Sequence, residues 1–124
     1  MTLRSERGSA PAEFVMVGLL LTFLTLAIVQ LALSLYVRNV VHDAAIDGAF
    51  YAALADTTVA EGEARVMTVV SRAINDSIVQ EVWGSETDGT ITMTVRATLP
   101  LVGFWGIAHG MEISAYAPVE TLDR

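Results

Sequence analysis

The side chains that most often carry catalytic or metal chemistry are scarce in this sequence. The chain has no cysteine, which excludes disulfides, thiolate metal sites and cysteine nucleophiles. Its two histidines, His42 and His109, are far apart along the chain, and neither has a companion at metal-ligand spacing. The sequence also lacks a phosphate-binding glycine loop, a nucleophile elbow and a carboxylate pair on a recognisable scaffold. We therefore expect a protein that is not an enzyme and that uses no cofactor.

One carboxylate is notable for its position, because Glu13 stands directly before a long apolar run. Residues 14–37 read FVMVGLLLTFLTLAIVQLALSLYV, which is 24 residues without an acidic or basic side chain. A helix rises about 1.5 Å per residue, so this run covers roughly 36 Å and crosses a hydrocarbon core of about 30 Å with some tilt. The sequence predicts a small single-pass membrane protein.

Charge is distributed unevenly around this span. Residues 1–37 carry two Arg and two Glu, while the remainder carries five Arg against twelve acidic residues, so the net charge of −7 lies after the span. An acidic domain repels phosphate backbones, and we expect no nucleic-acid partner. Arg4 and Arg7 precede the span and Arg38 follows it, which favours a cytoplasmic N-terminus and a C-terminal domain outside the cytoplasmic membrane.

The first 14 residues, MTLRSERGSAPAEF, allow three interpretations. A secretory signal peptide fits the basic start, but its apolar region should be about 7–15 residues long, which is much shorter than this run. An ordinary anchor fits each residue singly, with Ser9 as helix cap, Pro11 in the first turn and Glu13 near the positive end of the helix dipole. Neither accounts for the spacing of five residues between Gly8 and Glu13, and the third interpretation does.

The segment from Gly8 to Phe14 resembles the processing site of type IV-like prepilins, in the branch of the tight-adherence (Flp-type) pili. In that family a membrane aspartyl peptidase cuts after the Gly, the fifth residue of the mature chain is Glu, and the sixth is typically aromatic. Gly8, Ser9, Glu13 and Phe14 match this pattern, and the basic leader and uninterrupted span look like those of the TadE-like minor pilins or pseudopilins. The resemblance implies a leader of residues 1–8, removed by a prepilin peptidase.

The same resemblance implies partners and a role for Glu13. Besides membrane lipid, the expected partners are other pilin or pseudopilin subunits, the peptidase and a pilus assembly platform. Cleavage would leave a free α-amine on Ser9, and a carboxylate buried between packed helices is costly unless a neighbour's ammonium neutralises it. The resemblance implies that Glu13 sets subunit register in this way. A first-turn Glu that only complements the helix dipole is the alternative.

The helical pattern continues past the span. We predict one long helix within residues 9–56, from about Ala10 to Ala55, with its first half in lipid and its second half outside. Small residues at four-residue spacing let another backbone approach closely, either from a second subunit or from the domain's own core. These rows are Ala44, Gly48 and Ala52, and beside them Ala45, Ala49 and Ala53. Within the span, Gln30 either hydrogen-bonds to a neighbouring helix or lies at headgroup level.

A second helix should follow a short break. Thr57 or Thr58 could cap it, and Thr58 and Glu61 have the spacing of a capping box. An apolar stripe then continues to about Asn75. Residues 78–83 either extend this helix or form a first strand, and residues 84–89 read as a turn.

Alternating residues predict strands over 90–99 and 111–119. Residues 57–124 therefore predict a small exported α+β domain, with two or three antiparallel strands packed on the helices. This order of elements is pilin-like. In the intervening loop, Leu101–Gly110, the aromatic rings of Phe104 and Trp105 either contact a partner or the membrane interface, or close the end of a small core.

Two hypotheses of different classes follow. The first is a TadE-like minor pilin or pseudopilin, a structural membrane subunit that assembles a tight-adherence pilus or a related secretion machine and enters a cell-surface filament. The second is an uncleaved, membrane-anchored sensor or ligand-binding module whose acidic domain does the work.

Overall fold

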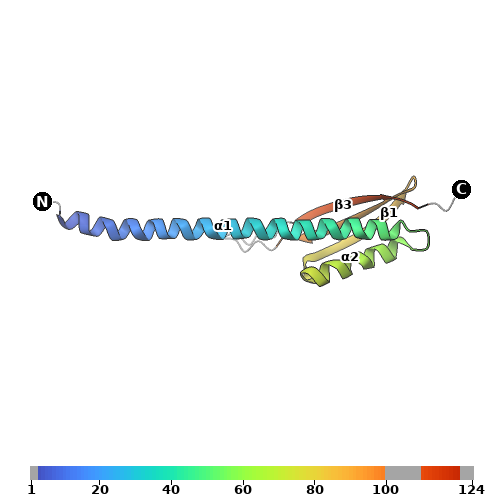
Figure 1. The fold of residues 1–124 in the computed structure, drawn as a ribbon, viewed down its shortest axis with the longest axis horizontal. Helices are drawn as coiled ribbons and strands as arrows, with labels where there is room; N and C mark the ends of the chain where they lie inside the picture. Colours follow the sequence, from blue (N-terminus) through green and yellow to red (C-terminus); the bar gives the residue numbers. More distant parts are fainter. Residues whose placement is uncertain (1–2, 100–109, 121–124) are drawn as a thin grey trace. The chain divides into compact units, whose positions relative to one another are not determined.

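A computed structural model of the chain describes residues 3–99 and 110–120. The elements are helix α1 (Leu3–Ala52), helix α2 (Val59–Ala73), a short 3-10 helix η1 (Asp76–Ile78) and strands β1 (Val79–Thr87), β2 (Thr90–Thr98) and β3 (Gly110–Pro118) (Figure 1). The predicted α+β class is confirmed, with a long N-terminal helix, a second helix and a three-stranded antiparallel sheet. The chain divides into two compact units, residues 1–33 and 34–124.

Helix α1 differs from its predicted bounds at both ends. It begins at Leu3 instead of about Ala10, so Pro11 lies inside the helix and not in its first turn. At the other end it stops at Ala52, and directly after it the Leu54 N–H donates to the Tyr51 carbonyl three residues earlier, not four as in an α-helix. There the Thr57 hydroxyl lies within hydrogen-bonding distance of the carbonyls of Tyr51 and Leu54. The Tyr51 carbonyl, one of the last carbonyls of the helix, thus has the Thr57 hydroxyl beside the backbone N–H of Leu54.

Helix α2 starts with the predicted capping box. The Glu61 N–H donates to the Thr58 hydroxyl at 3.2 Å, and the Thr58 N–H donates to the Glu61 carboxylate at 2.6 Å. Val66 and Val70 of the predicted stripe are fully buried, whereas Ala73 at the end of the helix is exposed. The helix ends there, within two residues of the predicted Asn75.

We expect Thr58→Ala to destabilise the domain by about 1 kcal/mol, because it removes the cap of α2. The measurement is denaturant unfolding of the full chain in detergent micelles, followed by circular dichroism. Thr68→Ala is the matched control, since the exposed Thr68 hydroxyl bonds only to the Ala64 carbonyl within the same helix. Equal stability of the two variants would contradict the role of the cap.

The sheet has the order β1-β2-β3, with antiparallel pairing throughout. Residues 79–83 of the ambiguous segment are strand. The predicted turn at 84–89 was wrong in extent, since residues 84–87 belong to β1 and only Asp88 and Gly89 make the turn. Both have positive φ, 52° and 75°, as a two-residue hairpin loop requires. The Gly at position 84 serves packing instead, because a Cβ there would lie 2.5 Å from Val59 Cγ1.

The predicted alternation of β2 and β3 is confirmed except at Thr94, which is buried on the opposite face of β2. Ile91, Met93, Val95 and Ala97 are at most 1% exposed, and on β3 Ile113, Ala115 and Ala117 are also buried. They pack in one core with the buried residues of α2 and with Val37, Val41 and the buried face of α1 that follows them. The compact unit begins at Ser34, so the second half of α1 is part of the domain.

Candidate processing site and assembly helix

The residues of the predicted processing site all lie in α1. Gly8, Ser9, Glu13 and Phe14 are exposed, and a Cβ placed on Gly8 would meet no atom within 4 Å. Because Ser9 and Glu13 are four residues apart, they share one face of the helix. The Ser9 hydroxyl donates to Glu13 Oε1 at 3.4 Å. An N-terminus created at Ser9 would thus begin one helical turn from the carboxylate, with both groups open to a neighbouring molecule.

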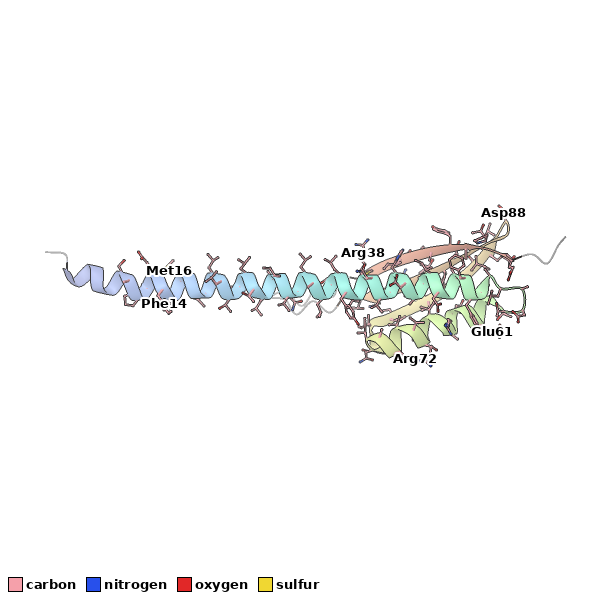
Figure 2. The ribbon with its side chains drawn as sticks, viewed as in Figure 1. Phe14, Met16, Arg38, Glu61, Arg72 and Asp88 are labelled. Carbon is pink, nitrogen blue, oxygen red and sulfur yellow. The ribbon has the colours of Figure 1, made fainter. Side chains whose placement is uncertain are left out.

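The apolar run projects its side chains outward. Phe14 is 81% exposed and Met16 68%, and the large apolar side chains that follow, as far as Leu35, stay more than 40% exposed (Figure 2). In the part of the chain that the structure describes, α1 is the helix long and apolar enough to cross a membrane. The stretch Gly8–Ala52 includes a window of mean hydropathy 2.4 that is not buried at all. Length and composition therefore fit a single-pass membrane protein.

Polar residues inside the run are mostly satisfied by the helix itself. The Thr22 hydroxyl donates to the Gly18 carbonyl and the Thr25 hydroxyl to the Leu21 carbonyl, each at 2.8 Å. These bonds let the threonines face lipid without a free donor. Gln30 is half-buried, and its hydrogen bond to a neighbouring helix stays a prediction.

The two rows of small residues lie inside the domain's own core. All six members are buried: the five alanines are at most 5% exposed, and Gly48 is in close contact with α2. The members are Ala44, Ala45, Gly48, Ala49, Ala52 and Ala53. Of the two partners that the spacing allowed, the structure shows the core. In this structure these residues face the core, and their place on an assembly surface stays a prediction.

Helices α1 and α2 approach each other at two glycines, Gly48 of these rows and Gly62 of α2. A Cβ on Gly48 would lie 2.3 Å from Val66 Cγ2 and 2.9 Å from the Gly62 carbonyl oxygen. A Cβ on Gly62 would lie 2.6 Å from Ala52 Cβ and 2.7 Å from the Gly48 carbonyl oxygen. Sequence reasoning missed Gly62, although its spacing of four residues before the buried Val66 is the signal that would have found it.

Ion pairs on the domain surface are exposed. Arg65 Nε lies 2.7 Å from Asp47 Oδ2, which raises the pKa of the Arg65 guanidinium, and its cation is 5.5 Å from the centre of the Tyr51 ring. On the sheet, Arg96 lies 3.3 Å from both Glu81 and Glu112. Exposed pairs of this kind contribute about 0–1 kcal/mol each. Part of the acidic surface therefore forms ion pairs within the domain.

No metal-binding group appears among the described residues, where no three His, Cys, Asp or Glu side chains cluster. His42 is exposed on α1. His109, Phe104 and Trp105 lie outside the described residues, as do most of the loop and its two proposed roles. Shallow surface grooves are present, including one between α2 and β1 that is lined by Glu63, Met67 and Val82.

Comparison with known proteins points to the N-terminal third of the chain. Residues 8–49 match the model of a family described as TadE-like protein. No curated protein and no solved structure matches the chain. The matched stretch begins at the Gly of the predicted processing site and covers the apolar run and most of the buried face of α1. Over residues 8–49, about a third of its length, the chain is therefore similar to the TadE-like proteins.

Proposed function

We propose that this membrane protein is a minor pilin or pseudopilin, a structural subunit rather than an enzyme. In this proposal a prepilin peptidase removes residues 1–8, and α1 then packs against the helices of other subunits on an assembly platform. The N-terminus lies in the cytoplasm and the domain of residues 34–124 outside the cytoplasmic membrane, from which the subunit enters a tight-adherence pilus or a related secretion machine.

One observation supports this proposal above the others. A carboxylate, Glu13, and the residue that would carry the new α-amine, Ser9, share one exposed face at the edge of an uncovered apolar helix. Opposite charges so placed suit helices that pack side by side in a medium where an unpaired ion is costly. The match of residues 8–49 to the TadE-like family supports the same assignment. An uncleaved anchor for a sensor domain has no comparable observation in its favour.

The start of the mature chain tests the proposal. The protein is extracted from membranes of cells that contain a prepilin peptidase, and its intact mass and N-terminal sequence are determined. We expect a chain that begins at Ser9 and is lighter by residues 1–8. The control is the same chain from cells without the peptidase, which should keep Arg4 and Arg7. A full-length chain from peptidase-containing cells would remove the processing step and favour the uncleaved anchor.

A further inference from the structure

The scissile bond that the proposed function requires lies in the interior of a helix. Helix α1 begins at Leu3, so the peptide bond between Gly8 and Ser9 has a complete helical turn on each side. In a regular helix the carbonyl of Gly8 accepts a hydrogen bond from the N–H of Ala12. A peptidase must free this carbonyl before it can attack it, and so the helix has to open locally around residues 7–9.

Pro11 interrupts the hydrogen bonds at this place. It lies inside α1, and proline has no N–H to donate. The acceptor that loses its partner is the carbonyl four residues earlier, that of Arg7, directly before Gly8. The pyrrolidine ring also crowds that same carbonyl. The helical turn before the scissile bond therefore lacks one hydrogen bond to the rest of α1, and it is held less firmly than a turn of a regular helix.

Gly8 weakens the same turn for a second reason. Glycine loses more conformational freedom than any other residue when it enters a helix. Among the described atoms it makes no compensating contact, since a Cβ at Gly8 would meet none of them within 4 Å. The same holds for Gly18, but that glycine lies deep in the apolar run and has no proline within four residues. In the described part of α1, a glycine without side-chain contacts and a proline within four residues of it occur together only at the predicted cleavage site.

After cleavage the same proline no longer weakens the helix. In a chain that begins at Ser9, Pro11 lies in the first turn, where backbone N–H groups have no helical acceptor in any case. Its fixed φ then favours the helical start. The residue therefore destabilises the precursor helix across the cut and suits the product helix.

From this asymmetry we infer that Pro11 determines how readily the chain is processed, by letting the helix open at Gly8–Ser9 before the peptidase acts. The inference rests on the proposed function, because it concerns the same cleavage. Pro11 is a positioning residue here: it acts through the conformation of the Gly8 carbonyl and does not itself react.

The test compares Pro11→Ala and Pro11→Gly with the natural chain, each as full-length protein in lipid vesicles with a purified prepilin peptidase. Alanine restores both the missing N–H and a strong helical preference, so cleavage should slow by about tenfold. Glycine restores the N–H but keeps the helix weak, so this variant should be cut at least several times faster than Pro11→Ala. Hydrogen exchange of the Ser9, Ala10 and Ala12 amides in the uncut chains should follow the same order, with the greatest protection in Pro11→Ala.

Each outcome decides a separate point. Unchanged cleavage of Pro11→Ala, despite better protected amides, would overturn the inference and leave the proposed function intact. Equal slowing of the alanine and glycine variants would also overturn it, because the peptidase would then read the proline ring and not the loosened helix. A natural chain that is never cut would instead remove the proposed processing, and with it the reaction that Pro11 is inferred to tune.

Discussion

Replacing Glu13 with alanine should leave the protein in the membrane but reduce its incorporation into an assembly at least tenfold. The apolar run begins after this residue, so insertion does not depend on its charge. Assembly does, because an unpartnered α-amine on a neighbouring Ser9 would then be buried between helices without a counter-charge. A tenfold loss corresponds to only about 1.4 kcal/mol, which is modest for an ion pair in a medium of low dielectric constant.

The measurement is the ratio of subunit in sheared filaments or isolated assemblies to subunit in the membrane fraction. Glu13→Gln tests the charge, since it keeps the size of the side chain but cannot neutralise an ammonium, and it should behave like the alanine variant. Ser9→Ala is the matched control, because it removes only the hydroxyl that bonds Glu13 at 3.4 Å and keeps the α-amine. N-terminal sequencing of each variant separates a defect in assembly from one in processing. Normal assembly by the alanine variant would refute the register role.

Gly62→Ala should be among the most damaging single-methyl changes in the domain, at about 2 kcal/mol. The added Cβ would lie 2.7 Å from the Gly48 carbonyl oxygen and 2.6 Å from Ala52 Cβ, so α1 and α2 would have to move apart. Overpacking of this kind typically costs about 1–3 kcal/mol, and relief is limited because two of the obstructing atoms belong to the backbone and to an alanine. Part of the cost is offset by the better helical preference of alanine, which is worth up to about 1 kcal/mol.

Denaturant unfolding of the full chain in detergent micelles measures this effect. Gly110→Ala is the matched control, because a Cβ there would meet no atom of the described residues within 4 Å, and its unfolding free energy should change by less than about 0.5 kcal/mol. Wild-type stability in Gly62→Ala would mean that the two helices do not approach as closely as described.

Local patterns in the sequence were sufficient for much of this fold. The capping box at Thr58 and Glu61 and the alternation of β2 depend on residues a few positions apart, and each was found where it was predicted. The turn predicted at residues 84–87 was wrong because small and polar residues occur in turns and in exposed edge strands alike. At Gly84 the packing against the side chain of Val59, 25 positions earlier in the chain, favours the strand over a turn. Local composition does not contain this information.

The site shows the same division. Gly8, Ser9, Glu13 and Phe14 could be found from spacing alone, because they act as a linear motif on one helix. The destination of the alanine rows could not, since a face of small residues suits a second subunit and the chain's own sheet alike. Only the tertiary structure shows that Ala45 and Ala49 are fully covered by the domain. The start of α1 at Leu3 was also missed, because the polar leader has no apolar period to mark a helix.

The order of the elements along the chain determines when the core of residues 34–124 can form during synthesis. The Glu120 N–H donates to the Ala53 carbonyl at 2.8 Å, so the segment after β3 is bonded to the residue that follows α1. Since α1 and α2 precede β3 in the chain, the part of the core that α1 shares with β3 cannot form until β3 has been synthesised. Because the buried face of α1 consists largely of alanine and glycine, it exposes little apolar area in the interval, much less than leucine or isoleucine would. The small residues thus limit the apolar surface that the nascent chain exposes, and they also permit close packing in the finished domain.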